Sequence, residues 1–315
     1  MMTDPARTPD PQRPALAYGT AAAAYDRGRP GYPREAVEWL LGSRPLSVLE
    51  LGAGTGKLTE LMVELGHDVF ATDPDDRMLD VLSARLPEVR ATVGSAEQIP
   101  VPDRSYDVVV AGQAFHWFDP ETALPEIARV LRPEGRIALL WNIRDERIPW
   151  VRRLGRLLGT HDSTTEGLVD AVDESAMFSA IDTREFRHWH VVDRETVQDL
   201  ALSSSTIASL EPVEREAKVA EVLDFYDDYG RGMDGMQLPY SAVGYRATLL
   251  PHAVVPVTPE PEEVAVELPG EEAAEPESDV DAMIRMTTDT AERLPRVVTD
   301  TDDGPDTEVI LIDFR

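Results

Sequence analysis

The 315-residue sequence contains no cysteine, only two lysines, and no apolar run as long as the roughly 20 residues that a membrane helix requires. The absence of cysteine excludes disulfides, thiolate metal sites and a cysteine nucleophile. The N-terminal residues are rich in proline and lack the apolar core of a signal peptide. We therefore expect a cytoplasmic protein that has no contact with a membrane.

Acidic side chains dominate the charge of the chain. There are 59 acidic residues against 30 basic ones, which gives a formal net charge of −29. Such a surface repels a phosphate backbone, so we expect no nucleic-acid partner. The densest basic cluster consists of Arg152, Arg153 and Arg156, whose spacing is typical of one solvated face of a helix.

Composition divides the chain into three parts. Residues 1–14 contain four prolines and are predicted to be disordered. Residues 15–250 alternate between strand-like and helix-like patterns and are predicted to form one domain. Residues 251–315 hold 18 Asp and Glu against 4 Arg, which predicts an acidic, largely disordered tail. The apolar end of this tail, residues 308–314 (EVILIDF), is an added strand, a docking segment for a protein partner or a loose end.

Short apolar segments alternate with helical periodicity in the middle of the chain. The expected strands are residues 47–51, 68–72, 89–93, 106–111, 136–141, 186–192 and 238–249. Residues 146–185 are predicted to be mostly helical. Strands that alternate with helices at this spacing indicate βαβ units and a parallel sheet, with the ligand crevice at the carboxyl ends of the strands.

Residues 50–57 (ELGAGTGK) form a glycine-rich loop between an expected strand and an expected helix. A Walker phosphate loop is excluded because Leu51 and Leu58 stand where a glycine and a Ser or Thr are needed. A dinucleotide fingerprint is weakened because Lys57 replaces its third glycine. An acidic-xGxGxG loop fits completely, with Glu50, Gly52, Gly54 and Gly56. The remaining alternative is a tight turn that binds no ligand.

Two further segments follow the next expected strands. Asp73 lies 23 residues after Glu50, where a carboxylate can accept hydrogen bonds from both hydroxyls of a ribose. The alternative role of Asp73 is to cap the next helix, a role that Asp75 can also fill. Residues 94–100 (GSAEQIP) follow the third expected strand.

Together these features resemble the class I S-adenosylmethionine (SAM)-dependent methyltransferases, specifically the methyltransferase type 11 domain. More narrowly, the chain resembles the small-molecule branch that includes trans-aconitate and ubiquinone/menaquinone-biosynthesis methyltransferases. The segments that carry this resemblance are 25–33 (YDRGRPGYP), 113–118 (QAFHWF) and 131–135 (LRPEG). The last segment departs from the usual LxPGG turn at Glu134. The resemblance covers residues 15–145 and continues more weakly to about residue 240.

The resemblance implies a doubly wound, Rossmann-like α/β sheet of seven mostly parallel strands with an antiparallel last strand. It implies SAM as the cofactor and methyl transfer to a small molecule, at an oxygen, with a carboxylate as one candidate acceptor. The expected cofactor contacts are Glu50, Gly52, Ala53, Gly54, Gly56, Asp73, Ser95, Ala96, Glu97 and Gln113.

Candidate residues for the reactive end lie after the expected strands and near the N-terminus. His116 is the candidate catalytic base, and its alternative role is to form a pocket wall beside Trp117. Trp117 is expected to close over the methionine arm of the cofactor or over the substrate. Tyr25 and Arg29 lie on an N-terminal segment that can act as a lid in this fold. Arg29 either pairs with a carboxylate of the substrate or cofactor, or makes a surface salt bridge.

Trp141 and Arg144 follow the fifth expected strand and are predicted to face the crevice, where Arg144 is a second candidate for an acidic substrate. His188 and His190 lie on one side of an expected strand, at a spacing that suits a metal. No third ligand is evident in the sequence, so we expect no metal.

Three other functions stay open at this point. The chain is a methyltransferase that acts on protein or RNA, a non-catalytic SAM-binding or interaction protein that works through its acidic tail, or a NAD-dependent oxidoreductase. Calorimetry with SAM and with NAD separates the last of these from the others.

Overall fold

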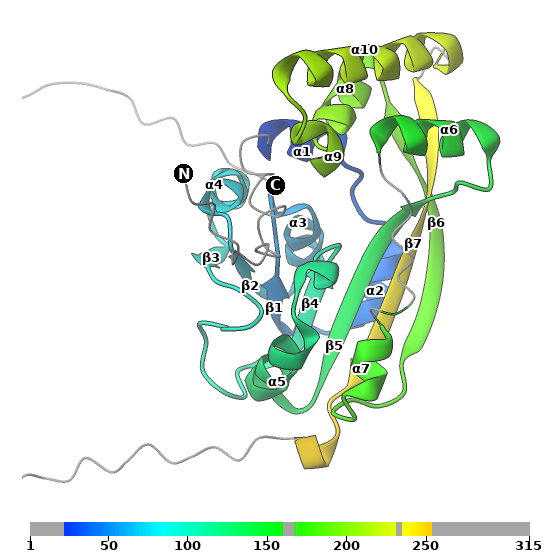
Figure 1. The fold of residues 1–315 in the computed structure, drawn as a ribbon. Coiled ribbons are helices and arrows are strands. Elements are labelled where there is room, and N and C mark those ends of the chain that lie inside the picture. Colours follow the sequence, from blue (N-terminus) through cyan, green and yellow to red (C-terminus); the bar gives the residue numbers. More distant parts are fainter. Residues whose placement is uncertain (1–21, 160–166, 168, 231–234, 254–315) are drawn as a thin grey trace, which may run out of the picture. The chain divides into compact units, whose positions relative to one another are not determined.

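The computed structural model describes residues 22–159, 167, 169–230 and 235–253, which form alternating strands and helices (Figure 1). The strands are β1 (Ser47–Leu51), β2 (Asp68–Asp73), β3 (Arg90–Val93), β4 (Tyr106–Gly112), β5 (Leu131–Arg144), β6 (Asp182–Val192) and β7 (Met236–Thr248). The longer helices are α1 (Ala22–Gly28), α2 (Arg34–Leu41), α3 (Lys57–Glu64), α4 (Asp76–Arg85), α5 (Pro120–Val130), α6 (Pro149–Leu158), α8 (Arg194–Leu202) and α10 (Pro212–Tyr229). Shorter turns of helix are η2 (Phe115–Trp117), α7 (Asp170–Glu174), α9 (Ser205–Ala208) and η3 (Pro251–Ala253). The predictions for residues 1–14 and for the tail beyond residue 253 lie outside the described residues.

One sheet organises the described residues, with the strand order β3-β2-β1-β4-β5-β7-β6. Strands β1 to β5 pair in parallel, and β7 runs antiparallel to both β5 and β6. The prediction of a seven-stranded, mostly parallel, Rossmann-like sheet with an antiparallel last strand is confirmed. The carboxyl ends of β1, β2 and β4 therefore lie along one edge of the sheet, as expected for a ligand crevice.

Helices cover both faces of the parallel strands (Figure 1). One face buries Val48, Val110 and Leu140 together with side chains of α2 and α3. The opposite face buries Leu49 and Leu139 against α5. Because both faces are covered, these strands consist of nearly continuous apolar residues, which is why they could be recognised in the sequence.

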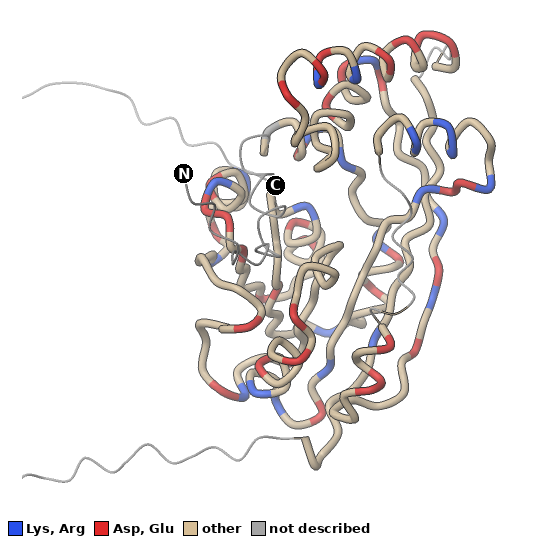
Figure 2. Tube along the Cα trace, viewed as in Figure 1, with Lys and Arg blue, Asp and Glu red and all other residues tan. Residues whose placement is uncertain are grey.

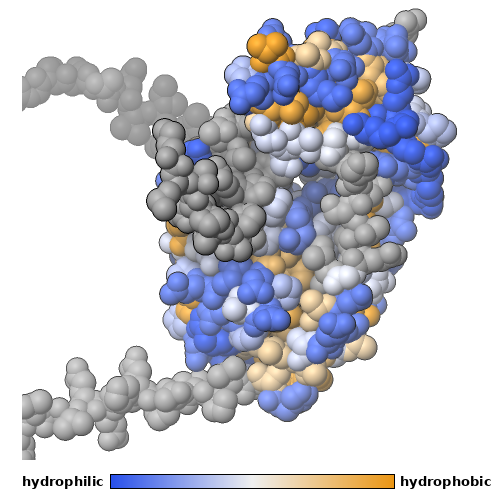
Figure 3. All heavy atoms as spheres, viewed as in Figure 1, coloured by the Kyte–Doolittle hydropathy of each residue, from blue (hydrophilic) through white to orange (hydrophobic). Residues whose placement is uncertain are grey.

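A separate apolar cluster joins α6, α8 and α10 to the adjoining ends of β6 and β7, and it includes Leu154, Leu200 and Phe225. In Figure 3, apolar residues gather around α6 and α10 on the face in view. Figure 2 shows acidic residues along α10 and basic residues on α6. The basic ones include Arg152, Arg153 and Arg156, which are all exposed, so the prediction of a solvated helix face is confirmed.

The prediction of a mostly helical segment from residue 146 to 185 is partly wrong. Helices α6 and α7 lie there, but β6 begins at Asp182. Residues 182–185 extend the strand because they pair with β7, starting with Asp182 opposite Arg246. The guanidinium of Arg246 also hydrogen-bonds to the Asp182 carboxylate at 2.7 Å. This partner lies 64 residues away in the sequence, so local periodicity could not indicate it.

Candidate functional site

The glycine-rich loop connects the end of β1 to the start of α3, and its three glycines have different roles. Gly52, Gly54 and Gly56 all have positive φ angles, of 69°, 57° and 87°. A Cβ on Gly52 would lie 2.4 Å from the Cβ of Ala114, and one on Gly56 would lie 2.9 Å from Leu82. A Cβ on Gly54 would meet no heavy atom within 4 Å. Packing therefore requires the outer two glycines, whereas the middle one borders open space.

Asp73 ends β2, and its carboxylate is turned towards this loop. The N–H of Gly54 donates to Asp73 Oδ2 at 2.8 Å, and the N–H of Asp75 donates to Oδ1 at 2.9 Å. The cap of α4 is Asp75, which accepts from the N–H of Arg77 at 3.1 Å. Burial raises the pKa of Asp73 to about 6. The capping role considered for Asp73 thus belongs to Asp75.

Glu50 is buried beneath the loop, where Thr59 of α3 donates to its Oε2 at 2.5 Å. Burial is the main reason that its pKa is raised to about 8, and the nearby Asp73 carboxylate adds to the effect. The contact ties β1 to the first turn of α3. Glu50 therefore supports the loop from below as well as lining the cavity above it.

A small polar cavity of about 40 Å³ lies against the loop. Of the predicted site residues, those that line it are Tyr25, Arg29, Glu50, Gly52, Ala53, Gly54 and Gln113. The lining residues that sequence reasoning missed include three with polar side chains: Tyr32, Thr55 and Lys57. The Thr55 hydroxyl is buried and has no hydrogen-bond partner among the residues that the structure describes. Tyr32 lies in the segment 25–33, and Thr55 and Lys57 lie in the loop 50–57, so membership of these motifs could have identified all three.

Gln113 lies directly after β4 in a conformation that is rare for a residue other than glycine, with a φ of 54°. Its N–H donates to the carbonyl of Leu140 at 2.8 Å, which holds the backbone in place. Its side-chain amide lies 3.5 Å from the hydroxyl of Tyr32, a partly buried residue whose pKa is raised, mainly by desolvation. Backbone strain of this kind is concentrated at functional sites.

The N-terminal segment of the described chain closes one side of the cavity. Arg27 of α1 donates to the Asp199 carboxylate of α8 at 2.6 and 3.1 Å. Arg29 donates to the hydroxyl of Ser203 at 3.0 Å and to its carbonyl at 2.9 Å. The guanidinium of Arg29 also lies 5.1 Å from the ring centre of Tyr25. In the described part of the chain, Arg29 is thus held beside the cavity by Ser203 rather than by a surface carboxylate.

The loop after β3 joins the same sheet edge. The N–H of Gly94 donates to the carbonyl of Asp73 at 3.2 Å. Ser95 forms a β-bridge with Gln98, Ala96 is buried, and Glu97 Oε1 accepts from the N–H of Asp119 at 3.0 Å. The loop thus connects β2 to the start of α5. Ser95, Ala96 and Glu97 do not line the cavity itself, and their predicted contacts with a cofactor stay predictions.

His116 and Trp117 lie in η2, just beyond β4, with ring centres 4.6 Å apart. Burial, helped by the positive charge of Arg29, lowers the pKa of His116 to about 4. Its Nδ1 is buried and has no hydrogen-bond partner within the described ranges. His116 is therefore a neutral ring at pH 7.

Two residues of β5, Trp141 and Arg144, were predicted to face the crevice, but neither lies at the glycine-rich loop. Trp141 is only 5% exposed and packs edge-on against Tyr245 of β7, with ring centres 5.7 Å apart. Arg144 is the last residue of β5 and pairs with Tyr240. Neither residue lines the cavity at the glycine loop.

His188 and His190 share a face of β6, as predicted, and each has a hydrogen-bond partner. His188 Nε2 lies 2.9 Å from Asn142 Oδ1, and His190 Nε2 lies 3.1 Å from the carbonyl of Gly28. Across the described residues, no group of three or more His, Asp or Glu is placed to hold a metal ion. Likewise, none of the described helices combines the length and the apolar character needed to cross a membrane.

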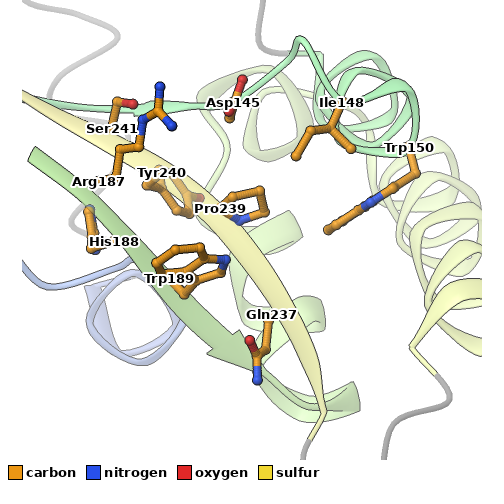
Figure 4. A pocket seen from close by; sticks show the side chains of 10 residues that line it. All are labelled: Asp145, Ile148, Trp150, Arg187, His188, Trp189, Gln237, Pro239, Tyr240 and Ser241. Carbon is orange, nitrogen blue, oxygen red and sulfur yellow. The ribbon is translucent and has the colours of Figure 1, made fainter.

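A second and larger cavity, of about 390 Å³, lies on β6 and β7 beyond the end of β5 (Figure 4). In Figure 4, Trp150 of α6 and Trp189 of β6 approach it from different elements, with Pro239 of β7 between them. The Trp189 side chain is 60% exposed. None of the residues predicted to contact the cofactor or substrate lines this cavity, whereas His188, which was considered as a metal ligand, does. Sequence reasoning did not find the cavity.

Comparison with known proteins gives concordant matches. The profile of a methyltransferase domain family matches residues 49–139. An uncharacterised methyltransferase of Mycobacterium tuberculosis is 44% identical over 238 residues, which cover 75% of this chain and 96% of that protein. A malonyl-[acyl-carrier protein] O-methyltransferase of Methylococcus capsulatus is 36% identical over 145 residues, which cover 42% of this chain and 52% of that protein.

Among solved structures, one from Anabaena variabilis carries the name of a methyltransferase from an antibiotic biosynthesis pathway. It is 21% identical, aligns with a TM-score of 0.53, and covers 69% of this chain and 96% of that chain. At that identity the likeness concerns the fold alone.

Proposed function

Since the chain belongs to the class I SAM-dependent methyltransferase family, we propose that it binds SAM at the glycine-rich loop and transfers a methyl group to an oxygen of a small molecule. When bound, SAM supplies a methyl group on a positively charged sulfur, which is already a good leaving group. The protein therefore needs to bind, orient and exclude water rather than supply a covalent intermediate.

A single observation carries the proposal: the main chain at Gly54 borders open space while its N–H is held by the Asp73 carboxylate. A ligand can approach this backbone closely because no side chain stands in the way. A carboxylate can accept about four hydrogen bonds, and Asp73 receives two from the backbone. The remaining sites suit the two hydroxyls of a ribose. The buried hydroxyl of Thr55 has no hydrogen-bond partner among the described residues, which also fits a polar ligand at this loop.

The other cofactor contacts follow from their places around the cavity. Gln113 and Gly52 follow the neighbouring strands β4 and β1, and both line the cavity. Arg29 presents a guanidinium that is held in place by the two hydrogen bonds it donates to Ser203, and guanidinium groups bind carboxylates well. We assign Arg29 to a carboxylate of the cofactor or of the acceptor.

An oxygen acceptor, with a carboxylate as the simplest case, is favoured by the properties of His116. A general base works best when its pKa lies near the operating pH, and the pKa of His116 is lowered to about 4. A ring that binds a proton so weakly suits a pocket wall beside Trp117. A carboxylate acceptor needs no base, because it is already deprotonated at pH 7. The match to an O-methyltransferase supports the same choice.

The proposal is tested by calorimetry and by product detection on the full chain. We expect SAM to bind and NAD not to bind. We then expect incubation with methyl-labelled SAM and a panel of small carboxylic acids, alcohols and amines, with and without added protein, to label an acid as its methyl ester. NAD binding without SAM binding would overturn the cofactor assignment. Label that appears only on amines or on added protein would overturn the acceptor class.

A further inference from the structure

Two histidines of β6 have no part in the proposed reaction, yet both are connected to the N-terminal segment beside the cavity, one by a direct hydrogen bond and one through an asparagine. His188 and His190 lie on the same face of β6, since alternate residues of a strand share a face. His190 Nε2 lies 3.1 Å from the carbonyl of Gly28. His188 reaches the segment indirectly, through Asn142 of β5. The sites that they hold, Gly28 and Gly31, border Arg29 and Pro30, which line the cavity.

The directions of these hydrogen bonds follow from the acceptors at the far end. The carbonyl of Gly31 can only accept, so Asn142 donates to it through Nδ2 at 2.9 Å. Asn142 therefore presents Oδ1 to His188, which donates through its Nε2–H at 2.9 Å. The carbonyl of Gly28 likewise accepts from His190 Nε2–H. Each ring thus carries its proton on Nε2.

Both histidine rings pack against the same tyrosine. Tyr240 of β7 stacks on His188 with ring centres 5.7 Å apart, and it meets His190 edge-on at 6.4 Å. Figure 4 shows His188 beside Tyr240 at the rim of the larger cavity. Burial lowers the pKa of both histidines, so each is neutral at pH 7 and has a single N–H to donate.

Residues 28–31 are packed closely against α8 at Gly28 and accept hydrogen bonds at the carbonyls of Gly28 and Gly31. A Cβ on Gly28 would lie 2.3 Å from the backbone nitrogen of Leu200, so the chain there already touches α8. Between the two anchors, Arg29 is held by Ser203. The positions of Gly28 and Gly31 therefore determine where the guanidinium of Arg29 lies relative to the glycine loop.

We propose that His190, and His188 acting through Asn142, are positioning residues that hold residues 28–31 over the glycine-rich loop. They act on ligand binding only by placing the segment that carries Arg29. The inference rests on the proposed function in one respect, namely that the cavity at the loop is the cofactor site. The placement of the segment itself does not depend on that function.

The test compares His190→Ala with His252→Ala. His252 makes the same kind of hydrogen bond, from its ring to the carbonyl of Ala176 at 2.9 Å, and does not line the cavity. Two measurements are made on the full chain: hydrogen–deuterium exchange of residues 22–33 without ligand, and the Kd for SAM by calorimetry. We expect His190→Ala to raise the exchange rates and the Kd roughly five-fold, which corresponds to the loss of one hydrogen bond of about 1 kcal/mol. We expect His252→Ala to change neither.

Two further variants separate positioning from general loss of stability. His190→Gln keeps an N–H donor and is expected to restore most of the affinity for SAM. Asn142→Asp keeps the acceptor for His188 but replaces the donor to Gly31, and it is expected to speed exchange around residue 31. Equal exchange in the two alanine variants would overturn the proposal, whatever the affinities. Absence of SAM binding in the unaltered protein would instead refute the cofactor assignment. The exchange data would still show whether His190 holds residues 28–31 in place.

Discussion

A substitution at Gly54 separates binding at the loop from packing of the loop. In Gly54→Ala the new Cβ meets no protein atom within 4 Å, so its methyl group enters the space assigned to the ligand. A non-glycine residue at positive φ costs about 1–2 kcal/mol, and part of this is offset by a less flexible unfolded chain. We therefore expect the free energy of unfolding to fall by about 1 kcal/mol.

Gly66→Ala is the matched control for this variant. Gly66 also has a positive φ, of 86°, and its Cβ would likewise meet nothing within 4 Å, but it does not line the cavity. The two variants should lose similar stability in urea unfolding. Only Gly54→Ala should lose affinity for SAM in calorimetry, by at least ten-fold, or about 1.4 kcal/mol.

A third variant, Gly52→Ala, calibrates the effect of packing. Its Cβ would lie 2.4 Å from the Cβ of Ala114, so overpacking should add about 1–3 kcal/mol to the loss of stability. The reasoning is refuted if Gly54→Ala binds SAM as tightly as Gly66→Ala does. It is also refuted if the loss of stability in Gly54→Ala equals that in Gly52→Ala, because Gly54 would then be required by packing.

Three other substitutions test the charges at the site. Asp73→Asn keeps an acceptor oxygen but loses the charge, so SAM affinity at pH 8 should fall roughly ten-fold or more in calorimetry. The unaltered protein should also bind SAM more weakly at pH 5 than at pH 8, because protonation below the Asp73 pKa of about 6 removes that charge, and Asp73→Asn should lack this dependence. Glu50 has a folded-state pKa of about 8 against 4.5 in the unfolded chain, so the folded state binds the extra proton and stability falls as pH rises from about 4.5 to 8. Between pH 5 and 8 the part of that fall due to Glu50 is worth about 4 kcal/mol at 1.36 kcal/mol per pH unit, and Glu50→Gln should remove it while leaving the smaller fall due to Asp73 below pH 6. Urea unfolding at pH 5 and 8.5 contradicts the argument if the variant loses as much stability between the two pH values as the unaltered protein does. His116→Phe should keep kcat/KM within about ten-fold of the unaltered enzyme, whereas a loss of 10²–10⁴-fold would identify His116 as a general base.

Much of the fold was predictable because its strands are buried on both faces and its turns use glycine and proline. The segment 106–111 was recognised from its unbroken apolar run, and the structure places β4 there with one further residue. The start of β6 was not predictable, because residues 182–185 are exposed and become a strand only by pairing with β7. Their side chains carry no apolar alternation that a periodicity argument could detect.

The candidate site was predictable to the extent that its residues lie in local motifs. The loop at residues 50–57 and Asp73 are each identified by spacing along the chain. Tyr32 was missed as a lining residue because its hydroxyl reaches Gln113 across 81 residues of sequence. The attachment of Arg29 to Ser203 spans 174 residues, and no pattern in the sequence connects the two.

The amino-acid sequence by itself determined the order of strands and helices and the glycine-rich loop, because backbone conformation and burial on two faces leave local patterns. Only the tertiary structure decided which glycine faces open space, which of Asp73 and Asp75 caps α4, and what His188 and His190 contact. These choices depend on atoms that folding brings together from distant parts of the chain. The three glycines look alike in sequence. Their roles differ because Ala114 lies beside Gly52 and Leu82 beside Gly56, whereas no atom lies within 4 Å of the position of a Cβ on Gly54.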